Sequence, residues 1–189
     1  MGEGGAILTD DPHIADQCRS LRNLYFQDKQ RFVHDELGWN YRLTNLQAAV
    51  GIAQLERVDE FIEIKHKMGR IYHERLGHIK SIRLPVATTE YADNIYWVFG
   101  IVLSDQIALN ARQFIEKLAA ENVGSRPFFF PIHQQPVFKK LGLFKSTTHN
   151  IADLLYENGF YIPSGLGLSE NMIDKVCTAV EKIAHQHSL

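Results

Sequence analysis

The sequence lacks any apolar run that approaches the roughly 20 residues needed to cross a membrane. It has only two cysteines, Cys18 and Cys177, and they lack the spacing of a CxxC or zinc site. Lys and Arg are spread along the chain and the formal net charge is -2, which argues against nucleic acid as a partner. The N-terminus has no basic and apolar regions typical of a signal peptide. These absences predict a cytoplasmic protein with free, buried thiols, no metal site, and no membrane or nucleic-acid partner.

The first part of the chain contains little that could form a core. Residues 6–9 are typical of a short buried strand, and Asp11-Pro12 predicts the start of a helix over 12–23. An aromatic loop over 24–43 follows, and loops of this length are usually functional or interfacial. One short strand and one helix bury too little apolar surface to fold alone. Residues 1–55 therefore look like the end of a larger domain.

A long helix is expected next, because Thr44 and Gln47 form a capping box and apolar residues then recur at helical spacing to Leu76. We interpret this helix, straight or bent, as a connector, with residues 56–77 joining 1–55 to a separate domain. Residues 78–189 predict a small α+β domain with strands near 82–86, 95–103 and 161–163. Asn110 and Ser169 are expected to cap two of its helices.

Several stretches, in this order along the chain, resemble the DegT/DnrJ/EryC1/StrS family of sugar aminotransferases. They are GEGGAILTDD, RSLRN, HDELGWNYRLTNLQAAVGIAQLERVDEFI, SRPFFFPIHQQPVF and YIPSGLGLSENMIDKV. The resemblance implies an α/β protein, the C-terminal portion of a fold-type I enzyme that uses pyridoxal phosphate (PLP). Residues 1–55 would then be a remnant of the large PLP domain, and the later residues would form the small sheet with its flanking helices.

The resemblance also bears on the catalytic lysine. In this family the GEGG motif follows the lysine that forms a Schiff base with PLP, so that lysine would lie before Met1 and this chain would hold no catalytic residue. Lys29, the first lysine of the chain, is either a substitute or, as we favour, a solvated loop residue. The chain alone is therefore expected not to bind PLP and to be inactive.

The family motif assigns Asn40 to the cofactor, because the matching asparagine reaches across the dimer to the PLP phosphate of the neighbouring subunit. An amide NH2 group is a suitable phosphate donor, although a turn asparagine before a capped helix is the plainer interpretation. Tyr41 and Arg42 share the loop and are predicted substrate-binding residues; Arg42 could pair with a phosphate or carboxylate or with a structural partner. His34 lies just upstream and could face the active site.

Arg126 and His133 bracket a rigid, aromatic segment that in the family lines the mouth of the active site. Arg126 suits a diphosphate and His133 a sugar hydroxyl or carboxylate. The alternative is a buried, satisfied pair that supports the loop.

Three hypotheses about function follow. The chain is part of a transaminase that acts on a nucleotide-linked keto-sugar, with glutamate as amino donor, similar to the perosamine synthase-like members of the family; such an enzyme is expected to be a homodimer. Alternatively it is a non-catalytic remnant that self-associates, or an assembly module that complements a separate N-terminal half.

Overall fold

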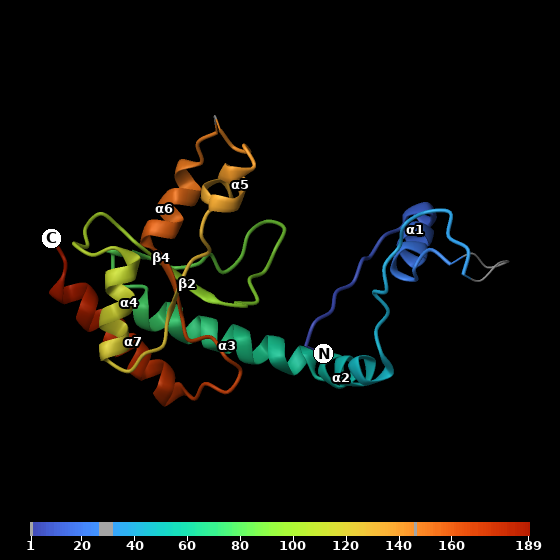
Figure 1. The fold of residues 1–189 in the computed structure, drawn as a ribbon. Helices are drawn as coiled ribbons and strands as arrows, with labels where there is room; N and C mark the ends of the chain where they lie inside the picture. Colours follow the sequence, from blue (N-terminus) through green and yellow to red (C-terminus); the bar gives the residue numbers. More distant parts are fainter. Residues whose placement is uncertain (1, 27–31, 146) are drawn as a thin grey trace. The chain divides into compact units, whose positions relative to one another are not determined.

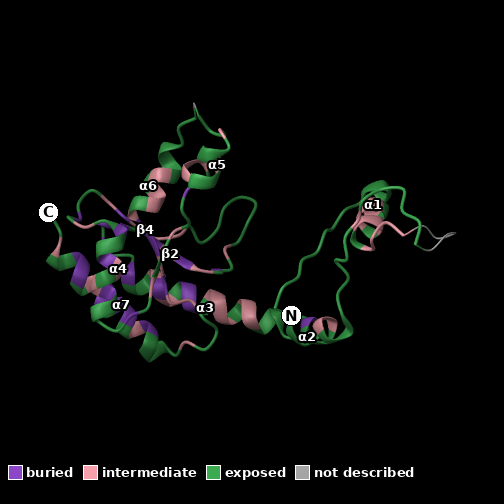
Figure 2. Cartoon of the chain, in the orientation of Figure 1, coloured by how far each residue is buried: buried purple, intermediate pink, exposed green. Residues whose placement is uncertain are grey.

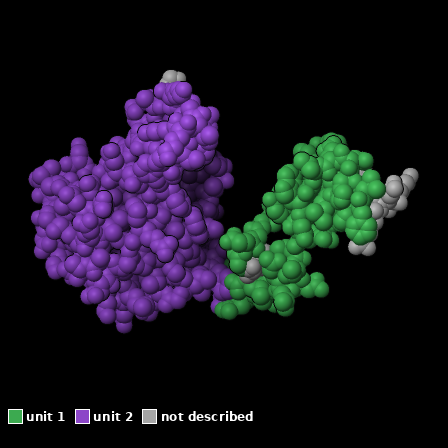
Figure 3. Space-filling view, viewed as in Figure 1, with its two compact units in different colours: residues 1–59 green, residues 60–189 purple. Residues whose placement is uncertain are grey.

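The computed structural model describes residues 2–26, 32–145 and 147–189. These residues form two compact units, 1–59 and 60–189 (Figure 3). The sequence-based division at residues 55 and 77 stays a prediction. We describe each unit separately.

The first unit contains two helices, α1 (Pro12–Arg22) and α2 (Asn45–Leu55) (Figure 1). Both begin where the sequence predicted: Asp11 accepts from the His13 amide, and Thr44 and Gln47 form a capping box. The predicted strand over residues 6–9 is wrong, since these residues have no ladder partner in the described chain and Ile7 and Leu8 are exposed. A strand of this length needs a neighbour to satisfy its backbone groups.

The predicted long helix is two helices, α2 and α3 (Val58–Leu76). The Glu56 amide still donates to the Ile52 carbonyl at 2.9 Å, but the Arg57 amide donates to the Gln54 carbonyl, three residues back, at 3.2 Å. This change from i−4 to i−3 bonding ends the first helix. The bent form of the prediction is therefore the correct one.

The second unit is a four-stranded antiparallel sheet with helices packed on it, as the α+β prediction required. The strands are β1 (Ile82–Arg83), β2 (Phe99–Leu103), β3 (Arg126–Pro127) and β4 (Gly159–Ile162), in the order β1-β2-β4-β3. The predicted edge and central strands are confirmed as β1 and β2, but both are shorter than predicted, since β1 ends at Arg83 and β2 begins at Phe99. The helices are α3, α4 (Ala111–Ala120), α5 (Pro136–Lys140), α6 (Asn150–Asn158) and α7 (Glu170–Gln186), with a 3-10 turn at Ile132–Gln134.

One face of this sheet carries the core. Alternate residues of β2 are buried, as the period of two requires, and they pack with Phe160 and Ile162 of β4 and with apolar residues of α3, α4 and α7 (Figure 2). The largest fully buried side chains are Tyr72, Phe99, Phe114, Phe160, Leu76, Ile101, Leu118 and Val180. The predicted caps are confirmed, since Asn110 forms a capping box with Gln113 and Ser169 accepts from the Met172 amide.

Both cysteines are free, as expected, but only Cys177 is buried and Cys18 is partly exposed. Burial, with the Asp174 carboxylate as a smaller contribution, raises the pKa of the Cys177 thiol to about 12.

Candidate functional site

The segment that carries Asn40 is held against the end of α1. The Trp39 and Tyr41 amides donate to the Leu21 and Arg22 carbonyls at 2.7 and 2.9 Å. Gly38 makes this close approach possible, because a Cβ there would lie 2.5 Å from the Tyr25 backbone nitrogen.

The Asn40 side chain faces a neighbour of its own loop. Its Oδ1 accepts from Arg42 Nε at 3.1 Å. The bond occupies the amide oxygen and leaves the NH2 group as a donor, while Arg42 keeps its terminal guanidinium nitrogens. Asn40, Tyr41 and Arg42 line a cleft of about 1120 Å³ within the first unit, together with residues 3–9 and Arg22. The predicted cofactor ligand Asn40, the predicted substrate ligands Tyr41 and Arg42, and Glu3-Gly4-Gly5 of the GEGG motif therefore line one cleft.

The chemistry of this cleft fits the phosphate of PLP, because an amide donor and the guanidinium groups of Arg19, Arg22 and Arg42 line it. It does not provide the covalent anchor, since no lysine is among the described residues that line it. Lys29 lies outside the described residues.

His34 is placed differently from Asn40. Its Nδ1 lies 2.6 Å from the Leu24 carbonyl oxygen, and its ring centroid lies 5.1 Å from that of Phe26. It is absent from the described lining of the cleft. Tyr41 stacks on Trp39, with ring centroids 6.2 Å apart, and both rings are exposed.

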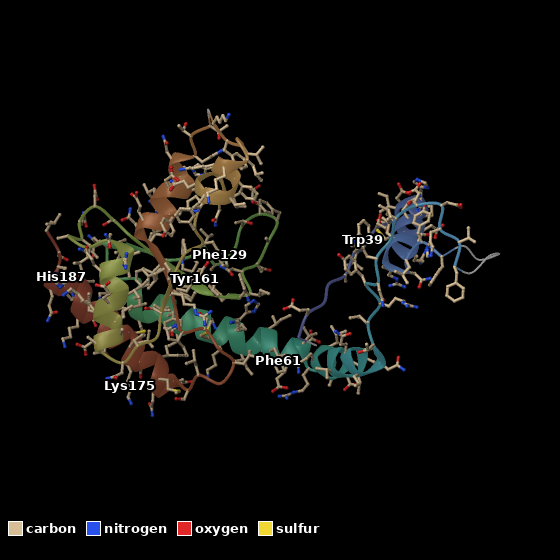
Figure 4. All side chains as sticks on the ribbon, in the orientation of Figure 1. Trp39, Phe61, Phe129, Tyr161, Lys175 and His187 are labelled. Carbon is tan, nitrogen blue, oxygen red and sulfur yellow. The ribbon has the colours of Figure 1, made fainter. Side chains whose placement is uncertain are left out.

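Arg126 lines a second, smaller cleft of about 370 Å³, within the second unit. We call it the Trp97 cleft; its lining residues are Trp97, Val98, Gly124, Ser125, Arg126, Tyr161, Ile162, Pro163 and Ser164. Arg126 is exposed and pairs with Tyr161 in the ladder, so the two side chains share one face of the sheet. Phe129 lies beside Tyr161, with ring centroids 6.1 Å apart (Figure 4).

The environment of the Trp97 cleft is partly desolvated. Burial raises the pKa of the Tyr161 phenol above its usual value. Ser125 Oγ is buried and has no hydrogen-bond partner in the described part of the chain. The cleft therefore offers a cation, aromatic surface and an unused hydroxyl.

His133 lies outside the Trp97 cleft and is held by α6. Its side chain is 12% exposed, and its Nε2 lies 3.0 Å from Asp153 Oδ1. Gln134 Nε2 donates to the same oxygen at 2.6 Å. His133 thus has a half-buried carboxylate partner, whereas Arg126 is exposed, so the two residues do not form the buried pair of the alternative interpretation and do not share one pocket. A substrate contact by His133 stays a prediction.

Sequence reasoning missed Trp97, Tyr161 and Lys65 as site residues. Trp97 lies in an apolar stretch that predicts a buried strand, yet its side chain is 69% exposed. Lys65 lies on a helix rich in charged residues, where a solvated side chain is the usual expectation. No local signal identifies any of the three.

Among residues 2–26, 32–145 and 147–189, no three His, Cys, Asp or Glu side chains are grouped so that they could hold a metal ion. In the same ranges none of the helices has the length and apolar character that a membrane span requires.

Comparison with known proteins gives the family. The model of the DegT/DnrJ/EryC1/StrS aminotransferase family matches residues 1–181. The GDP-perosamine synthase of Vibrio cholerae is 31% identical over 95% of this chain and 48% of its own length. That of Caulobacter vibrioides is 33% identical over 96% and 48%. The chain thus spans about half the length of these relatives.

The fold comparison agrees. Helicobacter pylori PseC, an aminotransferase involved in the biosynthesis of pseudoaminic acid, superimposes with a TM-score of 0.84 at 16% identity, over 94% of this chain and 48% of that one. On the family match and the likeness to both synthases, the chain belongs to the DegT/DnrJ/EryC1/StrS aminotransferase family.

Proposed function

We propose that this chain is part of a PLP-dependent aminotransferase that transfers an amino group, with glutamate as donor, to a nucleotide-linked keto-sugar. Membership of the aminotransferase family supports the reaction class. The names of the Vibrio and Caulobacter relatives support a nucleotide-linked sugar as the substrate.

The observation that carries the proposal is the arrangement of Asn40 and Arg42. Because Asn40 Oδ1 accepts from Arg42, the NH2 group of Asn40 is left to donate to an acceptor in the cleft. A phosphate oxygen is the acceptor that an amide NH2 and nearby guanidinium groups bind best. PLP, when bound, supplies the electron sink that lets an amino group move between substrates. In our proposal the chain forms a homodimer, and the NH2 group of Asn40 donates to the phosphate of the PLP that belongs to the neighbouring subunit.

The Trp97 cleft is the candidate site for the nucleotide. Arg126 would bind the diphosphate, and the exposed ring of Trp97 offers a surface on which a planar base could stack. His133, oriented by Asp153, would donate to or accept from a sugar hydroxyl only if the substrate reaches beyond this cleft.

The covalent anchor for PLP is expected to come from outside this chain. The isolated chain, mixed with PLP and reduced with borohydride, should show no specific adduct by intact mass. Stoichiometric modification of one lysine would contradict this part of the proposal.

The decisive experiment starts with the coding DNA upstream of the Met1 codon. We expect an in-frame cofactor domain with a lysine shortly before Gly2-Glu3-Gly4-Gly5. The protein expressed from the whole frame should transfer an amino group from glutamate to a GDP-linked keto-sugar. A stop codon or an unrelated sequence upstream would overturn the proposal.

Asn40→Ala in that protein should raise the dissociation constant for PLP on the order of tenfold or more, the size expected for a hydrogen bond to a charged group. Asn171→Ala, on the exposed start of α7, is the matched control and should leave it unchanged. Equal PLP affinity in wild type and Asn40→Ala would contradict the role given to Asn40.

A second candidate is a non-catalytic chain that self-associates. It is favoured by α2, an apolar helix whose residues are partly or fully exposed except for Gly51.

A further inference from the structure

The strands β2 and β4 separate at one end of their ladder. Phe99 pairs with Ile162 and Gly100 with Tyr161. Continued for two more residues, this register would place Trp97 opposite Ser164. Neither residue belongs to a strand, and both line the Trp97 cleft. The cleft therefore opens where the two chains leave the ladder, with one chain in each wall.

Lys65 bridges this opening. Its Nζ donates to the Trp97 carbonyl oxygen at 3.1 Å and also to the Ser164 carbonyl oxygen. One ammonium group thus replaces the direct pairing of the two chains. Lys65 does not itself line the cleft in the described structure, so any effect on a ligand is transmitted through the walls.

Lys65 places a positive charge at a partly buried position, which is uncommon for lysine. The side chain is partly buried, and desolvation lowers the pKa of its amine. No ion pair with a carboxylate is found for it among the described residues, so the two carbonyls are its recorded partners. Burial of a charge is unfavourable unless hydrogen bonds compensate it. An apolar side chain would avoid that cost but leave both carbonyls without a donor.

The Ser164 wall is fixed at neighbouring positions as well. Tyr72, seven residues after Lys65 and so on the same face of α3, donates from its hydroxyl to the Pro163 carbonyl at 2.8 Å. Ser164 Oγ donates to the Ile162 carbonyl and accepts from the Phe99 amide, both at 2.8 Å. These bonds hold the wall close to the start of β2.

The Trp97 wall has a second anchor immediately before the tryptophan. Tyr96 adopts φ = 49°, a left-handed conformation that is costly for a bulky residue. Its amide donates to Asn94 Oδ1 at 2.7 Å. Its buried ring lies over Gly69 of α3, where a Cβ would come within 2.3 Å of a ring atom. The turn at Tyr96 leaves the next residue, Trp97, 69% exposed between the buried Tyr96 and the half-buried Val98.

We propose that Lys65 is a positioning residue that holds the Trp97 and Ser164 walls at a fixed separation, so that the Trp97 cleft is preorganised for the planar ring of a nucleoside diphosphate. The ligand class rests on the proposed function, whereas the effect on Trp97 does not. Because the walls are already ordered, ligand binding does not carry the entropic cost of ordering them.

Trp97 provides a direct readout, because the chain has only two tryptophans. Trp39→Phe leaves Trp97 as the single reporter in the otherwise complete chain. In this background Lys65→Met, which keeps an apolar stem and removes the ammonium group, should increase acrylamide quenching of Trp97 and lower its fluorescence anisotropy. Lys65→Arg, which restores two donors, should return both values toward those of the parent. Lys65→Gln serves in place of the methionine variant if that variant does not fold.

Lys67→Met is the matched control. It removes the same charge from the same helix, but Lys67 is exposed and pairs with Glu170 on the surface at 2.6 Å. Trp97 should be unaffected. The proposal would be overturned if Lys65→Met left the acrylamide quenching and the anisotropy of Trp97 unchanged, or if Lys67→Met changed both as much as Lys65→Met does.

Titration with GDP separates this proposal from the function proposed above. If the parent binds GDP, Lys65→Met should raise the dissociation constant on the order of tenfold, and equal affinities would overturn the positioning role. If the parent does not bind GDP, the nucleotide assignment fails, and the quenching of Trp97 alone decides whether Lys65 holds the walls.

Discussion

At the scale of single residues, the ring of Phe128 covers two glycines on the sheet face opposite the core. Phe128 packs over Gly100 and Gly159, and its ring centroid lies 4.9 Å from that of Tyr161, which lines the Trp97 cleft. A Cβ on Gly159 would lie 2.4 Å from Phe128 Cδ2 and 2.3 Å from the Leu155 carbonyl oxygen. Glycine is required here by the space available, since its φ of -104° is accessible to any residue.

Gly159→Ala should therefore lower the free energy of unfolding by about 1 to 3 kcal/mol, as expected for overpacking. The measurement is urea unfolding of the whole chain, followed by circular dichroism. Gly165→Ala is the control, because nothing lies within 4 Å of a Cβ at that position. Equal stability of the two variants would show that the Phe128 ring and the Leu155 backbone both shift to admit the methyl group.

At the scale of elements, the chain uses the same capping box twice, at Thr44 before α2 and at Asn110 before α4. The local chemistry is equivalent, but the helices differ in what they bury. Phe114 and Leu118 of α4 are fully buried, whereas only Gly51 of α2 is buried. The cap of α4 is therefore linked to the core of the second unit.

Asn110→Ala should destabilise the chain by about 1 kcal/mol, because the Gln113 amide loses its acceptor. Asn110→Ser, which keeps a capping oxygen, should retain most of the stability. Urea unfolding measures both. A full loss in the serine variant would mean that packing, rather than the cap, is responsible.

At the scale of the whole molecule, the first unit exposes an unusual amount of apolar surface. The helix α2 has no charged residue, and Leu46, Val50, Ile52 and Leu55 are all exposed (Figure 2). A helix that is apolar on all sides is normally covered on all sides. Extended apolar surface of this kind usually marks an interface.

We therefore expect the isolated chain to self-associate at micromolar concentration, as measured by light scattering. Leu46→Lys should weaken the association without loss of fold, because Leu46 is 82% exposed and the substitution removes little internal packing. Leu189→Lys, at a residue that is 87% exposed in the C-terminal tail, is the control. A monomer at all accessible concentrations, or association insensitive to Leu46→Lys, would contradict an interface at α2.

Local features of the fold were predictable from the sequence because they depend on neighbouring residues. The caps at Asp11, Thr44, Asn110 and Ser169 each use a side chain to satisfy an amide two or three positions away, and all four were confirmed. The grouping of Asn40, Tyr41 and Arg42 around one cleft follows in the same way from their adjacency. Their roles toward PLP and substrate stay predictions.

The rest of the candidate site depends on contacts between distant residues. Lys65 meets Trp97 across 32 positions and Ser164 across 99, and no periodicity identifies such pairs. His133 was predicted as a substrate ligand or a satisfied partner, and Asp153, twenty positions later, supplies the partner. The 6–9 strand failed for the related reason that pairing depends on a neighbour.

The sequence by itself determined where the four capped helices begin, that the apolar stretch ending at Leu103 contains a central strand and to which family the chain is similar, because these follow from local hydrogen bonding, periodicity and motif. Tertiary structure decided where β2 begins, why Trp97 is exposed and what Lys65 binds. Tyr96 adopts a left-handed conformation, and the Lys65 ammonium group is shared by the Trp97 and Ser164 carbonyls. Both features are favourable only when the helix α3 lies beside them. That condition is a property of the assembled unit and not of any local stretch.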